Sequence, residues 1–348
     1  MDNIQSKARQ LIDTYSSRLK NHIELHGFCG EFIEANYEPE LEKTRLLCQC
    51  RSIFFLLDYA EITSDKTYID LAFELYIVIQ ANYFNDQSLM WSQYPGGTSN
   101  TLYEYAFLFL ALSKLYCVMP VDEIKQAADR VNEILQNNYL SIETNFKQLE
   151  DASGRLSQNA LMHLFEAYLE AYKVFKSQYY LDILEKLLAR LMQLFYSEQF
   201  TLISEYAPLD KHNDVFEPGH SFEWAALLFE AEHLNVKIPV NVKHQLIAQS
   251  AEKLGVIDSK LVVTQFTAKG DLDQERYRIW PLFERLRYYA MTKNKAMIDA
   301  NFKPFIALYF DKNDFPIEYV DHKLEADFRH IKATTSYHLI NCFKYLLI

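Results

Sequence analysis

Histidines and carboxylates occur together in this sequence at spacings that suit proton transfer. The clearest case is the segment 217–224, Glu-Pro-Gly-His-Ser-Phe-Glu-Trp, in which His220 and Glu223 stand three positions apart. Pro and Gly are typical of a loop that gives way to a helix, and residues three apart on a helix share one face. Because the helix dipole disfavours positive charge in the first turn, we expect His220 to be neutral and suited to act as a general base. A capping histidine or an ordinary ion pair has the same spacing.

Two other histidines lie in helix-forming segments. His163 stands in an apolar run and is followed three residues later by Glu166. His338 follows the hydroxyl cluster 334–336, which can cap the last helix and place His338 in its first turn. Taken singly, a satisfied core histidine and an ordinary helix-start residue explain these positions. Together, three histidines on helices with carboxylates nearby favour proton transfer over metal binding.

Charged and aromatic residues in unusual places indicate where a polar substrate could bind. Arg51 lies inside the run Cys-Gln-Cys-Arg-Ser-Ile-Phe-Phe, which suits a permanent charge only if it faces a polar cavity. The segment 278–284 adds Arg278, Trp280 as a stacking surface, and Glu284. Its proline is also a helix-boundary signal, so part of this motif can simply mark the start of a helix without a functional role.

The sequence lacks the motifs that are typical of several classes of enzyme. The sequence has no GxGxxG, GxxxxGK[ST], GxSxG or HExxH motif, and no set of residues has metal-ligand spacing. We therefore expect no cofactor and no metal. With 35 Lys+Arg against 47 Asp+Glu, the net charge of −12 argues against nucleic-acid and anionic-membrane partners. The five cysteines form no CxxC pair and lie mostly in apolar runs, and no targeting or membrane segment is evident, so we expect buried free thiols and a cytoplasmic location.

The elements that must position these residues are helices. Apolar residues recur with a helical period in twelve segments. The predicted segments are 4–25, 41–62, 68–83, 101–118, 121–136, 157–175, 184–195, 220–234, 240–254, 273–291, 295–310 and 335–347. A weak repeat supports their pairing as six hairpins, so we predict an all-α (α/α)6 barrel as a single domain over residues 1–348, with an open helical array as the alternative.

Four stretches break the helical pattern: 85–99, 143–156, 199–219 and 256–272. The last includes Lys260-Leu261-Val262-Val263-Thr264, which can form a short strand, and the first includes Trp91. Long insertions on one face of such a fold are where a site is built. We therefore expect short β segments in loops on the active-site face.

The sequence resembles the N-acylglucosamine 2-epimerase family, which includes mannose isomerases, sulfoquinovose isomerase and cellobiose 2-epimerase. Six motifs carry the resemblance in the family's order: Arg45–Phe54, Thr101–Phe107, Gln158–Ala167, Glu217–Ala225, Arg278–Glu284 and Ala333–Leu339. The string Pro-Gly-His-x-Phe-Glu-Trp-Ala is the most specific of them. The family's fold is an (α/α)6 barrel, which agrees with the twelve helical segments.

The resemblance implies a role for each of these residues. His220 and His338 would be the acid/base pair, and His163 and Glu223 would help to open the sugar ring. Arg51 would hold substrate oxygens. The other implied substrate-binding residues are Asn159, Trp224, Arg278, Trp280, Glu284, Tyr103 and Trp91.

The implied activity is proton transfer between adjacent carbons of an opened monosaccharide, through a cis-enediolate. The segments 278–281 and 336–338 are closer to the mannose-isomerase branch, which favours aldose–ketose isomerisation over 2-epimerisation. A glycoside hydrolase that uses Glu223, Glu284 or Asp151, and a non-catalytic sugar-binding module, are the remaining alternatives. We expect a small saccharide as the partner, and a monomer or a homodimer.

Overall fold

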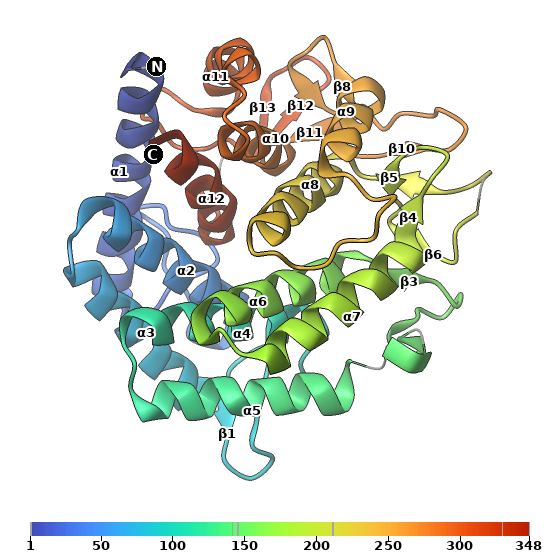
Figure 1. The fold of residues 1–348 in the computed structure, drawn as a ribbon. Helices are drawn as coiled ribbons and strands as arrows, with labels where there is room; N and C mark the ends of the chain where they lie inside the picture. Colours follow the sequence, from blue (N-terminus) through green and yellow to red (C-terminus); the bar gives the residue numbers. More distant parts are fainter. Residues whose placement is uncertain (1, 141, 145, 211, 329, 348) are drawn as a thin grey trace. The chain divides into compact units, whose positions relative to one another are not determined.

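The computed structural model describes residues 2–140, 142–144, 146–210, 212–328 and 330–347, and twelve α-helices make up most of this part of the chain (Figure 1). The helices are α1 (Asp2–His26), α2 (Leu46–Thr63), α3 (Thr67–Asn82), α4 (Leu102–Val118), α5 (Asp122–Asn138), α6 (Asn159–Phe175), α7 (Gln178–Phe195), α8 (Pro218–His233), α9 (His244–Gly255), α10 (Trp280–Met291), α11 (Lys295–Tyr309) and α12 (Ser336–Leu347). Short 3-10 turns are η1 (Leu41–Lys43), η2 (Ile142–Thr144), η3 (Lys147–Leu149) and η4 (Ala333–Thr335).

Short antiparallel strands lie in the connections between helices. They are β1 (Phe84–Asn85), β2 (Met90–Trp91), β3 (Leu156–Ser157), β4 (Tyr196–Ser197), β5 (Leu202–Ile203), β6 (Tyr206–Ala207), β7 (Val215–Phe216), β8 (Val256–Ile257), β9 (Leu261–Val262), β10 (Phe266–Thr267), β11 (Arg276–Arg278), β12 (Tyr319–Asp321) and β13 (Ala326–Phe328). The pairs are β1 with β2, β3 with β6, β4 with β5, β7 with β10 and β8 with β9, while β11, β12 and β13 form one three-stranded sheet. The strand predicted at 260–264 is confirmed as β9.

Each of the twelve predicted helical segments contains a helix, but four of the helices start four or more residues from the predicted position, namely α2, α7, α9 and α10. Residues 41–43 form the separate turn η1, because Arg45 is extended and its backbone N–H and guanidinium bond Glu31. In the segment 273–291, residues 276–278 pair with β12 as a strand, so α10 begins only at Trp280. Pro281 suits the first helical turn because its missing N–H has no partner there.

The chain divides into two compact units, each of which is described by itself. Unit 1 consists of Met1–Asn138, Glu166–Lys176 and His330–Ile348, and unit 2 of Tyr139–Phe165 and Ser177–Arg329. The sequence-based assignment of 1–348 to a single domain stays a prediction.

In unit 1 the core is built around α2. This helix is buried from Leu46 to Ala60 because α3, α4 and α12 pack around it, and α5 covers α4 (Figure 1). In unit 2, α8 has the same position between α9 and α10 and is buried from Pro218 to Leu228. The starts of both α8 and α12 carry histidines that the sequence singles out.

The cysteines are free thiols, four of them buried, and Cys117 is exposed near the end of α4. Burial raises the pKa of Cys48 and Cys50 well above the ordinary value, which makes these thiols unreactive. Among the described residues, none of the helices combines the length and the apolar character needed to cross a bilayer.

Candidate functional site

His220 lies in the first turn of α8, buried against two carboxylates. Its Nδ1 is 3.0 Å from Oε1 of Glu205 and 3.5 Å from Oε2 of Glu217. The ring of Trp280 packs on the imidazole at a centroid distance of 4.9 Å. The helix starts at Pro218, two residues before the predicted start, because a proline fits the first helical position.

The expectation that His220 is neutral is wrong. Burial by itself would lower the pKa of His220, but the charges of Glu205 and Glu217, with a smaller effect of Glu223, raise the pKa to about 9. One hydrogen-bonded carboxylate and a second at 3.5 Å outweigh the partial charge of a helix N-terminus. At neutral pH the structure therefore favours His220 as an imidazolium, a proton donor.

The two carboxylates that contact His220 lie in the connection between α7 and α8. Glu205 lies between β5 and β6, and its backbone N–H donates to the carbonyl of Val215 at 2.8 Å, which ties it to β7. Glu217 is the residue that precedes α8, directly after β7. Burial and the charge of Glu205 raise the pKa of Glu217, whereas His220 opposes this shift. The segment from β5 to the start of α8 thus places both carboxylates next to the His220 imidazole.

Replacement of Glu205 with Gln should flatten the pH dependence of stability. A histidine with a folded-state pKa of about 9 and an ordinary unfolded value of 6.5 stabilises the fold fully below about pH 6.5, and this contribution is lost as the pH rises to about 9. We expect urea denaturation to show about 1–3 kcal/mol less loss over this range for Glu205→Gln than for the wild type. Glu198→Gln, in an exposed acid that accepts from Asn241, is the control and should keep the wild-type slope. An unchanged slope in Glu205→Gln would contradict the assigned ion pair.

Unit 2 also brings His163, Glu223 and Glu284 close together. A carboxylate oxygen of Glu223 lies within 4.8 Å of a ring nitrogen of His163 and of an oxygen of Glu284. All three residues are at most 3% exposed. Arg287 donates to Glu284 at 3.1 Å and balances part of the negative charge. Three predicted site residues from α6, α8 and α10 thus surround one buried polar centre.

The predicted aromatic residues of unit 2 have different surroundings. Trp280 contacts His220, and a side chain at Gly219 would bring a Cβ to 2.6 Å from the Trp280 ring, so this close approach requires glycine. Trp224 is 1% exposed, packs on Phe165 and donates its indole N–H to Gln158 at 2.7 Å. Trp280 therefore packs on the His220 imidazole, whereas Trp224 contacts Phe165 and Gln158.

Arg278 and Asn159 are the remaining predicted site residues of unit 2. Arg278 lies over the rings of Trp280 and Tyr319 and is 3.8 Å from Glu318, and its buried Nε has no partner in the described part of the chain. Asn159 is the first residue of α6, and its buried Oδ1 likewise lacks a partner among the described residues. Both side chains retain hydrogen-bonding capacity that a substrate could use.

In unit 1, Arg51 is held by polar and aromatic neighbours. It donates to the hydroxyl of Tyr103 at 2.7 Å and to the carbonyl of Thr334 at 3.3 Å. Its guanidinium lies 4.4 Å from the ring centre of Phe107 and 4.9 Å from that of Tyr337. Its Nε is buried without a partner within the described residues. A buried cation that is fixed but not fully hydrogen-bonded suits the binding of an oxygen-rich ligand.

His338 and Trp91 also belong to unit 1. His338 is in the first turn of α12, as predicted, and its ring contacts that of Tyr337 at 4.9 Å. The hydroxyl of Tyr337 donates to Glu166, which places this acid in the surroundings of His338. Trp91 packs on Phe84, and its carbonyl accepts from Tyr105 and Asn100.

Sequence reasoning missed Glu205, Gln158 and the part played by Glu217. Glu217 was visible as the residue before Pro-Gly-His, where an acid three positions before a histidine on one helix face is a usable signal. Glu205 lies in the non-helical stretch 199–219, where nothing local marks it. Gln158 opens the motif Gln158–Ala167, but nothing near it in the sequence indicates a contact with Glu205. The ligand atoms of Glu205, Glu217 and His220 lie within 4.8 Å of one another, but an imidazolium has no free lone pair for a metal, so we assign this trio as an ion-paired cluster.

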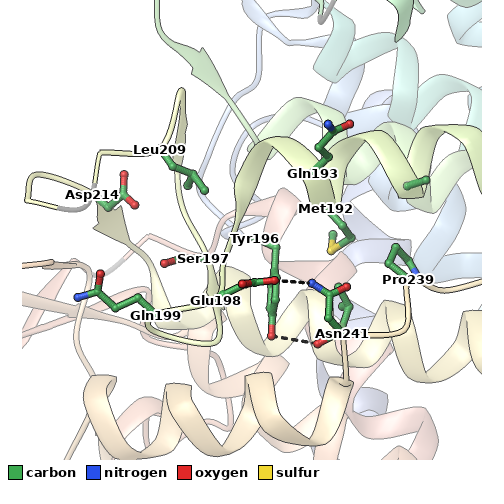
Figure 2. Close-up of a pocket in the computed structure, with 12 residues that line it drawn as sticks. Met192, Gln193, Tyr196, Ser197, Glu198, Gln199, Leu209, Asp214, Pro239 and Asn241 are labelled. Carbon is green, nitrogen blue, oxygen red and sulfur yellow. Dashed lines mark hydrogen bonds between the residues drawn. The ribbon is translucent and has the colours of Figure 1, made fainter.

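A separate cavity of about 830 Å³ lies in unit 2 at the end of α7 (Figure 2). Tyr196, Glu198 and Asn241 line it, and Figure 2 shows the bonds from Tyr196 to the Asn241 carbonyl and from the Asn241 amide to Glu198. None of the lining residues belongs to the set predicted from the sequence. The buried imidazoles and acids, and not this hollow, therefore define the candidate site.

Solved structures show the fold. The chain is similar to cellobiose 2-epimerase from Bacillus thermoamylovorans B4167, with a TM-score of 0.82 and 17% identity over 100% of this chain and 99% of that one. It is also similar to a D-mannose isomerase, with a TM-score of 0.74 and 18% identity over 94% and 96% of the two chains. With the twelve helices, these likenesses confirm the predicted all-α (α/α)6 class with short β segments.

Sequence comparison gives the family. The chain is 26% identical over 207 residues to mannose-6-phosphate isomerase of Rhizobium meliloti (strain 1021), and the match spans 55% of this chain and about half of that relative (54%). The model of N-acylglucosamine 2-epimerase (GlcNAc 2-epimerase) matches residues 80–299, which is more than half of the chain and includes His163, His220 and Glu223. The chain therefore belongs to the N-acylglucosamine 2-epimerase family.

Proposed function

We propose that the protein is a sugar aldose–ketose isomerase of the mannose or glucose to fructose type. The observation that carries this proposal is a set of buried imidazoles next to carboxylates in unit 2. His163 and Glu284 each lie close to Glu223, and His220 lies close to Glu205 and Glu217. Two imidazoles next to several acids can move protons at near-neutral pH without a redox group. Family membership and the likeness to a D-mannose isomerase support a sugar as the substrate.

The proposed reaction begins with ring opening, which unmasks the C1 carbonyl and makes the proton on C2 acidic. Proton removal from C2 leaves a cis-enediolate. Return of the proton to C1, together with transfer of the hydroxyl proton from O2 to O1, gives the ketose. His220, held as an imidazolium by Glu205 and Glu217, is the donor of the pair at neutral pH. His338 is the proposed acceptor, with Glu166 and Tyr337 in its surroundings.

The other residues have binding roles in this proposal. His163 and Glu223 assist ring opening, and Arg51 and Tyr103 bind substrate oxygens, where a cation stabilises the negative charge of the enediolate. Trp280 offers an apolar face next to His220 for one side of the sugar. Arg278, Asn159, Glu284 and Trp91 remain proposed substrate contacts.

A 2-epimerase is the second candidate, because the structure is similar to a cellobiose 2-epimerase over its whole length. The two reactions share the enediolate and differ in the carbon and the face to which the proton returns. Epimerisation returns it to the opposite face of C2.

The product from heavy water decides between these candidates. The protein would be incubated with mannose, glucose, N-acetylmannosamine, cellobiose and mannose 6-phosphate, with a chelator present, and followed by NMR. We expect a ketose from mannose or glucose, with the position and extent of deuterium reporting how the proton is returned. A C2 epimer with deuterium at C2 would favour the epimerase, and cleavage of cellobiose would favour a glycoside hydrolase. Absence of any product from all five sugars would contradict the proposed function.

A further inference from the structure

A chain of hydrogen bonds leads from a buried tryptophan to the imidazole of His220. The indole Nε1 of Trp224 donates to Oε1 of Gln158 at 2.7 Å, and Nε2 of Gln158 lies 3.2 and 3.3 Å from the two oxygens of Glu205. Oε1 of Glu205 then accepts from Nδ1 of His220 at 3.0 Å. Trp224, Gln158 and Glu205 are 1%, 0% and 4% exposed, so the chain is shielded from water.

The indole determines how the Gln158 amide is oriented. An indole nitrogen only donates, so the amide atom that faces Trp224 must be the oxygen. The amide NH2 group must then face Glu205, and because an NH2 group only donates, Glu205 meets it with acceptor oxygens. A flipped amide would place two donors against each other on one side and two acceptors against each other on the other.

The backbone holds the two middle members of the chain in register. Ser157 of β3 pairs with Tyr206 of β6, and the backbone N–H of Gln158 donates to the carbonyl of Glu205 at 3.0 Å. Gln158 directly follows β3 and Glu205 directly precedes β6, so their side chains start from neighbouring positions at one end of the paired strands. This arrangement leaves Gln158 little freedom to turn away from Glu205.

We propose that Gln158, oriented by Trp224, is a positioning residue that holds Glu205 as the acceptor for Nδ1 of His220 and so leaves Nε2 of His220 as the nitrogen that exchanges protons with the substrate. This inference rests on the proposed function only in taking a sugar as the group that exchanges a proton with Nε2. The protonation pattern that it assigns belongs to the protein itself. In the sugar reaction, Gln158 and Trp224 act through Glu205 and His220 without contact to the reacting atoms.

Other charged and aromatic groups also face His220. Glu217 approaches the same nitrogen at 3.5 Å, and Glu223 adds a weaker negative charge from the same helix. Trp280, the first residue of α10, contributes an uncharged face, and Arg278 of β11 lowers the pKa of Glu217. Glu217 is farther from Nδ1 than Glu205 is. If the Glu205 contact is lost, Glu217 should still stabilise the proton on Nδ1, but less strongly.

The experiment measures the titration and the tautomer of His220 directly. Protein labelled with 13C and 15N in histidine would be titrated by NMR, with the His220 signals assigned by their loss in His220→Ala. In Gln158→Met, which keeps the length of the side chain but has no amide, we expect the midpoint to fall by about one pH unit or more. We also expect a mixture of the two neutral tautomers, and kcat to fall about tenfold or more with little change in KM.

Two further variants make the result specific. Trp224→Phe keeps an aromatic ring on Phe165 but removes the indole donor, and it should shift the His220 midpoint in the same direction by a smaller amount. Gln136→Met is the matched control, because this half-buried amide donates to the hydroxyl of Tyr168 at 2.7 Å in unit 1. It should leave the titration of His220 unchanged.

The outcomes are separable. A folded Gln158→Met protein with the wild-type midpoint and tautomer of His220 would overturn the inference, and so would an unchanged Trp224→Phe protein if Gln158→Met does not fold. If the shifts occur but the wild type converts none of the sugars, the proposed function fails and the positioning role of Gln158 stands.

Discussion

Replacement of His220 with alanine is expected to lower kcat of sugar conversion about 10³-fold, with the fold retained. Nδ1 of this imidazole donates to Glu205 and lies 3.5 Å from Glu217, so Nε2 is the nitrogen that we propose for the substrate. Alanine removes the proton donor and leaves the binding groups in place, so KM should change little. Product formation by NMR and the circular dichroism spectrum measure the two parts of this expectation.

His338→Ala should cause a loss of the same size if both histidines serve one proton transfer. Groups that act as a unit are strongly non-additive, so the double variant should be about as slow as either single variant. His212→Ala, in an exposed histidine of unit 2, is the control and should keep the wild-type rate. Near-native turnover by His220→Ala or His338→Ala would show that the role assigned to that residue is wrong, and additive losses would assign the two residues to separate steps.

Replacement of Asp58 with asparagine is expected to destabilise the protein by about 3–5 kcal/mol. Asp58 is 1% exposed in unit 1 and forms ion pairs with Lys114 and with Lys344, the latter at 2.8 Å. Burial would raise the pKa of Asp58, but the two lysines lower it far below its usual range. Without the carboxylate, two largely buried ammonium groups face each other with no counter-charge.

Urea denaturation at neutral pH measures this loss. The control is Asp129→Asn, which breaks a surface pair with Lys125 at 2.6 Å and should cost at most about 1 kcal/mol. Because the folded-state pKa of Asp58 is depressed, its contribution is complete above the unfolded value of 3.8 and is lost only as the pH falls below it. An Asp58→Asn protein as stable as the control would contradict the assigned triad.

The depressed pKa of Asp58 and the raised pKa of His220 have one cause. In each case burial opposes the charged form, and two oppositely charged partners at short distance reverse its effect. For Asp58 the partners come from α4 and α12, and for His220 from the β5–β7 segment and the residue before α8. The first arrangement stabilises a buried carboxylate in unit 1, whereas the second stabilises a buried imidazolium in unit 2.

The positions of the helices and of their reactive residues could be predicted from the sequence alone. A stripe of apolar residues specifies a helix through local geometry, and Pro218 or the hydroxyls 334–336 mark where a helix starts. For this reason His220 and His338 were predicted in first turns, where the structure has them. The six motifs likewise indicated the family, because they depend on residue identity and order.

Tertiary structure alone decided the protonation state of His220. The local signal, a histidine at a helix start, predicts a neutral ring. Glu205 and Gln158, however, lie fifteen and sixty-two positions before His220, in the connections between helices. The pairing of β3 with β6 and of Glu205 with β7 brings them to the imidazole. A pKa depends on charges and hydrogen bonds through space, which the sequence near a residue does not contain. The surroundings of Arg51 and the contact of Trp224 with Gln158 were determined in the same way, by the folded arrangement of distant segments.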